Sequence, residues 1–205
     1  MPTLLLVDDN SSVREIFSLF LTKLGFEIQT ADSGETCITL LGTLTPDLIL
    51  LDVMMEPMDG WETLLAIRGN PKTRSVPVMM VTAKPPTKDE LLRYGGDVDD
   101  FVMKPVDFKS LSGSISQVIA MNMQMNRTIQ ELLDRGVDED RIREYVALLR
   151  RVRMMRNLSG RFQDLWSPDL PSLELQESRL ARLEGDLGIA AHPENAPEGD
   201  PPGRP

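Results

Sequence analysis

The sequence predicts an α/β fold, a doubly wound parallel sheet of five strands, followed by an α-helical extension. Three observations support this prediction. Short and nearly continuous apolar runs alternate five times with amphipathic stretches over the first 120 residues. Such runs are typical of strands covered on both faces, and the stretches between them are long enough for helical crossovers. After Pro105 the alternation stops, and apolar residues recur with helical spacing instead.

Each apolar run is interpreted as one strand of the sheet. The runs, in chain order, are Leu4–Val7, Phe26–Thr30, Leu48–Leu51, Val76–Val81 and Phe101–Met103. The segments between them carry helical patterns of roughly 10 to 15 residues, as right-handed crossovers require. Two of these helices have a start signal of the capping-box type, Ser12 with Glu15 and Thr87 with Glu90. In sheets of this kind, function lies beyond the carboxyl ends of the strands.

A long helix is expected from about Asp107. Its inward positions alternate steps of three and four residues: Phe108, Leu111, Ile115, Val118, Asn122, Met125, Ile129 and Leu132. This is a heptad pattern in which Asn122 occupies one a-type position. Packing on the sheet explains the first half of the pattern, whereas the part beyond residue 121 needs another partner.

Two more helices are expected after the long one. Gly136 ends the long helix, and a second helix with the apolar stripe Ile142–Met155 begins near Asp138. A short third helix is expected from about Ser172 to Leu187. The remaining tail is rich in proline, glycine and acid, a composition typical of disorder.

The chain therefore divides into residues 1–120 for the α/β domain, 121–187 for a helical extension concerned with dimerisation or output, and 188–205 for a disordered tail. The net charge of −10 is spread unevenly. Residues 1–120 hold 10 basic and 17 acidic side chains, whereas residues 121–161 hold 9 basic and 6 acidic ones. The acidic first part fits a cation-binding site, and the basic segment could meet an anionic partner or be a solvated surface.

Several classes of protein are disfavoured by composition. No apolar stretch approaches the roughly 20 residues that a membrane span needs. The start of the chain lacks the basic region of a signal peptide. Cys37 is the only cysteine, so no disulfide can form within the chain. We therefore expect a cytoplasmic protein that does not associate with membranes.

Carboxylates follow two strands that should be neighbours. Asp8 and Asp9 follow the first apolar run, and Asp52 follows the third. In a doubly wound sheet, the order in which strands are added reverses between these two strands. The three side chains therefore gather at the crevice that opens there. Their mutual repulsion favours a hard divalent cation such as Mg²⁺. Helix capping is the alternative for each aspartate alone, but it does not explain why acids recur at both strands.

Two more polar residues end the last strands. Thr82 closes the fourth apolar run, and Lys104 closes the fifth, directly before Pro105. Taken singly, Lys104 could be a surface lysine and Thr82 an ordinary strand threonine. Taken together with the acids, they supply a positive charge and a hydroxyl donor where negative charge would collect. The pattern indicates a combined anion and metal site.

Four segments resemble the receiver domain of bacterial and archaeal response regulators. They are LLLVDDN at Leu4–Asn10, PDLILLDVMMEPMDG at Pro46–Gly60, VPVMMVTAK at Val76–Lys84 and DDFVMKP at Asp99–Pro105. The resemblance covers all of residues 1–120 and implies a flavodoxin-like sheet with strand order 2-1-3-4-5. It departs from the family pattern at Glu56-Pro57, where the proline comes one residue late, and at Asp97-Val98, where Gly-Ala is commoner.

The resemblance also implies a role for each residue of the site. Asp52 would accept a phosphoryl group from a sensor histidine kinase. Asp8, Asp9 and Asp52 would hold Mg²⁺ together with the backbone carbonyl of Met54. Thr82 would be the switch hydroxyl, Phe101 the switch aromatic and Lys104 the lysine that faces the phosphoryl group. The resulting two-state change would affect the face made by the fourth helix, fifth strand and fifth helix.

The output of such a switch is open to two interpretations. The heptad around Asn122 favours a homodimer, although a small monomeric bundle would show the same stripe. The run Arg150–Arg156 could instead bind DNA phosphates. Enzymatic outputs are disfavoured: an aspartyl phosphohydrolase usually has a second aspartate where Met54 stands, and the only histidine for phosphotransfer, His192, lies in the tail. We expect a two-component response regulator that is not an enzyme and acts through a protein partner or DNA.

Overall fold

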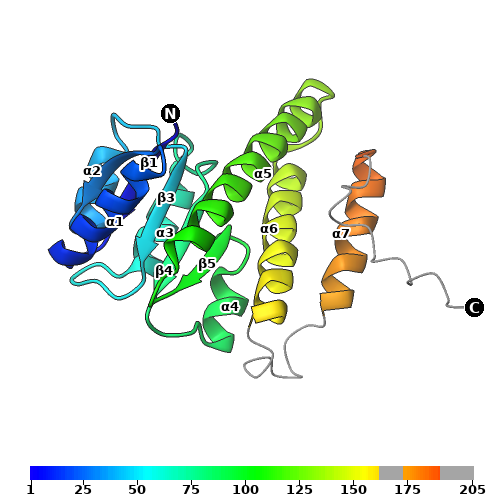
Figure 1. Ribbon diagram of the computed structural model, residues 1–205. Helices are drawn as coiled ribbons and strands as arrows, with labels where there is room; N and C mark the ends of the chain where they lie inside the picture. Colours follow the sequence, from blue (N-terminus) through cyan, green and yellow to red (C-terminus); the bar gives the residue numbers. More distant parts are fainter. Residues whose placement is uncertain (162–172, 190–205) are drawn as a thin grey trace, which may run out of the picture.

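The computed structural model describes residues 1–161 and 173–189, and its first part is a three-layer α/β domain (Figure 1). The strands are β1 (Thr3–Val7), β2 (Glu27–Ala31), β3 (Leu48–Asp52), β4 (Val78–Thr82) and β5 (Asp100–Met103). All four pairings are parallel and the order is β2-β1-β3-β4-β5. The predicted doubly wound sheet is confirmed in topology and strand number.

Helices cover both faces of this sheet. They are α1 (Ser11–Lys23), α2 (Gly34–Leu40), α3 (Gly60–Gly69), α4 (Lys88–Tyr94) and α5 (Phe108–Asp134). Successive strand side chains point to opposite faces. Leu4 and Leu6 accordingly join the core beneath α1 and α5, whereas Leu5 and Val7 join the core beneath α2 and α3. The nearly unbroken apolar runs of the sequence follow from this two-sided burial.

Local capping differs from the prediction at one helix. The expected capping box of Thr87 and Glu90 is present at α4. At α1 the cap is Asn10, whose side chain accepts hydrogen bonds from the amides of Ser12 and Val13, so the prediction based on Ser12 was wrong. Asparagine precedes a helix as readily as serine does, which makes neighbouring candidates hard to separate by sequence.

The helical extension continues α5 with α6 (Glu139–Arg161) and α7 (Leu173–Leu187). The predicted break after α5 is confirmed, since Gly136 has a φ of 73°, a value that favours glycine. Within α5, Leu111, Ile115 and Val118 pack on the sheet, whereas Met125 and Leu132 lie in a separate core with α6 and α7. The second half of the heptad pattern is therefore buried within the chain.

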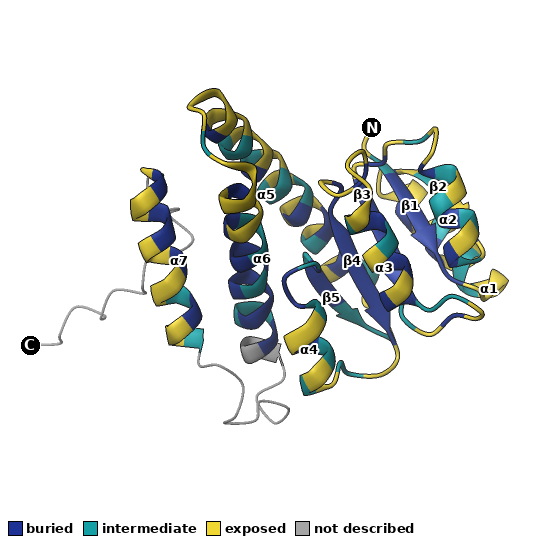
Figure 2. Cartoon of the chain, turned by 180° about the vertical axis from the view of Figure 1, so that it is seen from behind, coloured by how far each residue is buried: buried dark blue, intermediate teal, exposed yellow. Residues whose placement is uncertain are grey.

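Helix α6 also returns to the α/β domain. It contacts β5, and its Met154, Met155 and Leu158 belong to the same apolar cluster as Leu91 and Phe101. Figure 2 shows α6 buried along most of its described length, between α5 and α7. Among residues 1–161 and 173–189, no helix is both long and apolar enough to cross a bilayer. The predicted disorder beyond residue 189 concerns residues outside the described ones.

Candidate functional site

Three carboxylates meet at the carboxyl edge of the sheet. Val7 pairs with Leu51 in the β1–β3 register, which places the following Asp8 and Asp52 on neighbouring strand ends. Each of Asp8, Asp9 and Asp52 offers an oxygen, and these oxygens lie within 4.8 Å of one another. Asp8 and Asp52 are buried, whereas Asp9 is exposed. A hard cation that prefers oxygen ligands, such as Mg²⁺, fits this donor set.

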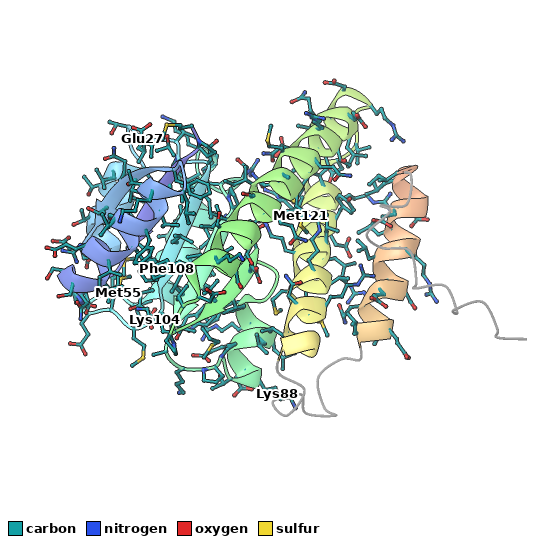
Figure 3. The ribbon with its side chains drawn as sticks, viewed as in Figure 1. Glu27, Met55, Lys88, Lys104, Phe108 and Met121 are labelled. Atoms are coloured by element: carbon teal, nitrogen blue, oxygen red, sulfur yellow. The ribbon has the colours of Figure 1, made fainter. Side chains whose placement is uncertain are left out.

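Lys104 bridges the two buried carboxylates. Its Nζ lies 2.8 Å from Asp8 Oδ2 and 2.9 Å from Asp52 Oδ2. Figure 3 shows Lys104, just beyond β5, at the same end of the sheet as Met55 beyond β3. Burial disfavours the ammonium ion, but the hydrogen bonds to Asp8 and Asp52 outweigh it and raise the pKa of Lys104. The lysine therefore stays charged beside the acids.

The environment of Asp52 combines opposing influences. Burial raises the pKa of Asp52, and the hydrogen bond and charge of Lys104 oppose this without cancelling it. The backbone N–H of Met54 also points to the carboxylate, with a distance of 3.4 Å to Asp52 Oδ1. Asp52 is thus a buried carboxylate with the Lys104 ammonium at Oδ2 and the Met54 N–H at Oδ1, next to a cleft that its neighbours Val53 and Met54 line.

The adjoining cleft has a volume of about 450 Å³. The cleft is lined by Asp9, Met54, Thr82 and Phe101, among others. Every residue that the sequence predicts for the site therefore lies in this cleft or at the acidic cluster beside it. The Thr82 hydroxyl donates to the carbonyl of Lys84 at 3.0 Å and accepts from the N–H of Lys84 at 3.1 Å. Thr82 is therefore close to the acids, but its hydroxyl is bonded to its own loop.

Sequence reasoning missed an aromatic connection between this cleft and α4. The Trp61 indole N–H donates to Glu90 Oε1 at 3.0 Å, and the Trp61 ring stacks on Tyr94 at a centroid distance of 4.7 Å. The same ring lies 6.0 Å from the ring of Phe101. The sequence did contain a signal for this connection. Trp61 stands directly after the loop that follows Asp52, and a tryptophan there is conspicuous in a chain with only 5% aromatic residues.

The predicted basic surface is largely turned inward. Arg150 and Arg153 are 4% and 8% exposed. Arg150 Nε donates to Asp99 Oδ1 at 2.9 Å, and Arg156 Nε donates to Glu177 Oε1 at 2.7 Å. Asn122 faces Arg150 and Asp99 around a cavity of about 10 Å³. Its expected role in a dimer stays a prediction, because in this structure it lies at the seam between α5 and α6.

A buried aspartate bridged to a lysine, beside a metal-compatible acid cluster in a β2-β1-β3-β4-β5 sheet, defines a receiver-type domain. Comparison with known proteins agrees with this class. Residues 4–116, more than half of the chain, match the response regulator receiver domain family. The chain therefore belongs to the response regulator receiver family.

Similar regulators are found in several bacteria. Transcriptional regulatory protein AfsQ1 of Streptomyces coelicolor is 38% identical over 58% of this chain and 52% of its own length. The DNA-binding dual master transcriptional regulator RpaA of Synechocystis is 28% identical over 66% of this chain and 57% of its own. The match thus spans about half the length of these relatives, which are named as regulators and not as enzymes.

Solved structures support the fold. The N-terminal domain of a response regulator receiver protein from Methanoculleus marisnigri is 45% identical, with a TM-score of 0.50, over 58% of this chain and 98% of that one. The receiver domain of a sensor histidine kinase from Pseudomonas aeruginosa is 25% identical, with a TM-score of 0.53 over the same shares. That receiver holds a magnesium ion in its active-site cleft.

Proposed function

We propose that this chain is a two-component response regulator in which Asp52 accepts a phosphoryl group from a sensor histidine kinase. The observation that carries the proposal is the contact of Lys104 with both Asp8 and Asp52 inside a cluster whose oxygens lie within 4.8 Å. Mg²⁺ would be held by Asp8, Asp9, Asp52 and the backbone carbonyl of Met54. A bound Mg²⁺ neutralises charge on the phosphoryl oxygens and on the acids.

The protein's own groups account for the rest of the transfer. The Asp52 carboxylate attacks phosphorus in line while the P–N bond to the donor histidine breaks, and the bonding pair stays on the imidazole. The product is an acyl phosphate on Asp52. Lys104, already 2.9 Å from Asp52 Oδ2, stabilises the charge that develops on a transferring oxygen. Thr82 can donate to the phosphoryl group only after its bond to the Lys84 carbonyl breaks.

The output proposed for this switch is control of protein association. The phosphoryl group adds about −1.5 to −2 charge at the edge of β3, which changes the balance between two arrangements of the α4–β5–α5 face. A homodimer or a downstream partner would use that face together with the helical extension. The chain would act in the cytoplasm and contribute no catalysis beyond accepting, and slowly releasing, its own phosphoryl group.

Control of transcription through DNA is a second candidate. The names of the relatives AfsQ1 and RpaA favour it. Burial of Arg150 and Arg153 weighs against the direct contact of this helix with phosphates, since α6 would first have to leave its place. Charge-neutral variants of both arginines should abolish salt-dependent DNA binding if this candidate holds.

The proposed function can be tested with acetyl phosphate as a small phosphoryl donor. Intact mass should show one added phosphoryl group on the full chain in the presence of Mg²⁺. The addition should disappear in Asp52→Asn and after chelation of the metal. Equal labelling of Asp59→Asn and wild type provides the matched control, because Asp59 caps α3 near the cleft and is not in the acidic cluster. Undiminished phosphorylation of Asp52→Asn would disprove the assignment.

A further inference from the structure

The α4–β5–α5 face of this chain is already covered by its own helix α6. Met154, Met155 and Leu158 are buried there in one apolar cluster with Leu91 of α4 and Phe101 of β5. A Cβ added at Gly95, the cap of α4, would lie 2.3 Å from Met154 Cε, so the two helices are in close contact. In the strand order, β5 is an edge strand, and α6 protects that edge.

Polar contacts fix the position of α6 on this face. Arg150 Nε donates to Asp99 Oδ1 at 2.9 Å, and Asn157 Nδ2 donates to Asp100 Oδ1 at 3.2 Å. Asp99 is itself fixed, because its Oδ2 accepts from Arg68 at 2.9 Å and from the N–H of Val78 at 2.8 Å. Buried ionic contacts of this kind specify position more than they add net stability. This contact between α6 and the α4–β5–α5 face, called the α6 seam below, is therefore specific in position.

The same seam is connected to the phosphorylation site. Phe101 borders the cleft beside Thr82 and also packs in the cluster that contains Met154. Trp61 joins Phe101 to α4 through its stacking on Tyr94 and its hydrogen bond to Glu90. Phe101 and Trp61 thus connect the loop after Thr82 to α4 and β5, the two surfaces on which the C-terminal half of α6 rests.

We propose that α6 is an internal inhibitor of the α4–β5–α5 face and that phosphorylation of Asp52 releases it. This inference rests on the proposed function. Docked α6 fits the arrangement in which the Thr82 hydroxyl bonds to Lys84. When Thr82 turns to the phosphoryl group, α4 and Phe101 shift beneath α6. A close-packed contact cannot adjust to such a shift by gradual deformation, so the contact with α6 breaks. Release of α6 then uncovers the edge strand and the apolar side of the helix.

A disulfide can lock α6 in place. A Cβ built at Gly96 lies 3.4 Å from Ala147 Cβ, close to the separation of about 3.5–4.5 Å seen in disulfides. Cys37 is fully buried and does not compete. The full chain carrying Gly96→Cys and Ala147→Cys would be compared oxidised and reduced, with beryllofluoride and Mg²⁺ as the probe. Binding would be followed by Trp61 fluorescence in a Trp166→Phe background.

Oxidation should weaken beryllofluoride binding about tenfold, within the range of typical couplings between sites, and reduction should restore it. Because α6 docking and beryllofluoride binding oppose each other, a variant that weakens the α6 seam should bind beryllofluoride more tightly. Arg150→Met removes the ion pair with Asp99 and should tighten binding about fivefold, whereas the matched control Arg143→Met, at an exposed position of the same helix, should leave it unchanged.

The outcomes separate this inference from the proposed function. If wild type binds beryllofluoride and the oxidised lock binds it equally well or more tightly, α6 is not an inhibitor, although Asp52 remains the phosphoryl acceptor. If the wild-type chain neither binds beryllofluoride nor gains mass from acetyl phosphate, the proposed function fails and the inference fails with it. A reduced double variant that differs from wild type would show that the substitutions themselves disturb the site; Arg150→Met would then decide alone.

Discussion

Replacing Lys104 with methionine removes the ammonium group and keeps most of the aliphatic stem. Its Nζ makes hydrogen bonds of 2.8 and 2.9 Å to Asp8 and Asp52. Hydrogen bonds to charged groups contribute about 1.5–3 kcal/mol each. Methionine loses about as much rotamer freedom as lysine, so side-chain entropy changes little, but with 22% of the lysine side chain exposed, water screens the two bonds and the lower end of this range applies to the pair. We expect a net loss of about 2 kcal/mol in the free energy of unfolding without Mg²⁺.

Mg²⁺ should reduce this loss, because a divalent cation at the acidic cluster takes over part of the neutralisation. Saturating Mg²⁺ should bring the difference between Lys104→Met and wild type below about 1 kcal/mol. Phosphoryl transfer should still fall roughly 100- to 1000-fold, as it does when a donor to a developing charge is removed. Urea unfolding followed by circular dichroism, with and without Mg²⁺, and initial rates with acetyl phosphate provide the two measurements.

Lys109→Met is the matched control, since Lys109 is exposed in the first turn of α5 and should leave both quantities unchanged. An equal loss of stability with and without Mg²⁺ would refute the idea that the lysine and the ion share the same carboxylates. A transfer rate within about threefold of wild type would refute the electrostatic role of Lys104.

Further predictions concern other parts of the chain. Burial raises the pKa of Cys37 to about 12 from its ordinary value of 9.0, so the folded state keeps a proton that the unfolded state loses. Stability from this group should be complete below pH 9.0 and fall as pH rises toward 12, and at pH 8 a thiol reagent should label Cys37 only in denaturant. Leu132→Ala should cost about 3 kcal/mol because Leu132 is fully buried, whereas Leu133→Ala, at an exposed position, should cost under about 0.5 kcal/mol in urea unfolding. Arg68→Met should cost about 2–4 kcal/mol in the same assay, because Asp99 loses one of its two buried arginine partners and the carbonyls of Val76 and Asp97 lose a donor. Thr82→Val should still gain a phosphoryl group by mass, but hydrogen exchange in α4 should no longer change on phosphorylation, since the hydroxyl that links the two sites is gone.

The sheet and the acidic cluster could be predicted because local and global signals agree there. Strands buried on both faces leave continuous apolar runs, and parallel strands bring their carboxyl ends to one edge. Strand-end position alone therefore predicts that Asp8, Asp9 and Asp52 lie together, and the structure brings their oxygens within 4.8 Å. Lys104 followed from the same reasoning.

The packing of the extension could not be predicted, because periodicity shows that a helix has an apolar side and does not show what covers that side. Met125 and Leu132 fit an intermolecular heptad and an internal core equally well. The arginines of α6 read as a basic surface, yet the acid that pairs with Arg150 is Asp99, 51 residues away in sequence. Long-range ion pairs of this kind leave no local signal.

The connection through Trp61 was missed for a related reason. Glu90 was recognised as a capping residue, which it is, but its second carboxylate oxygen also accepts the Trp61 indole N–H. A capping motif is a local pattern and does not reveal a tertiary contact made by the same side chain.

The proposed switch depends on Asp52 being the residue that carries the phosphoryl group. Borohydride reduces an acyl phosphate to an alcohol, so treatment after incubation with acetyl phosphate and Mg²⁺ marks the modified side chain permanently for peptide mass analysis. The mark should fall on Asp52 and should require Mg²⁺. A mark on Asp8, Asp9 or any other acid, or one that is independent of the metal, would contradict it.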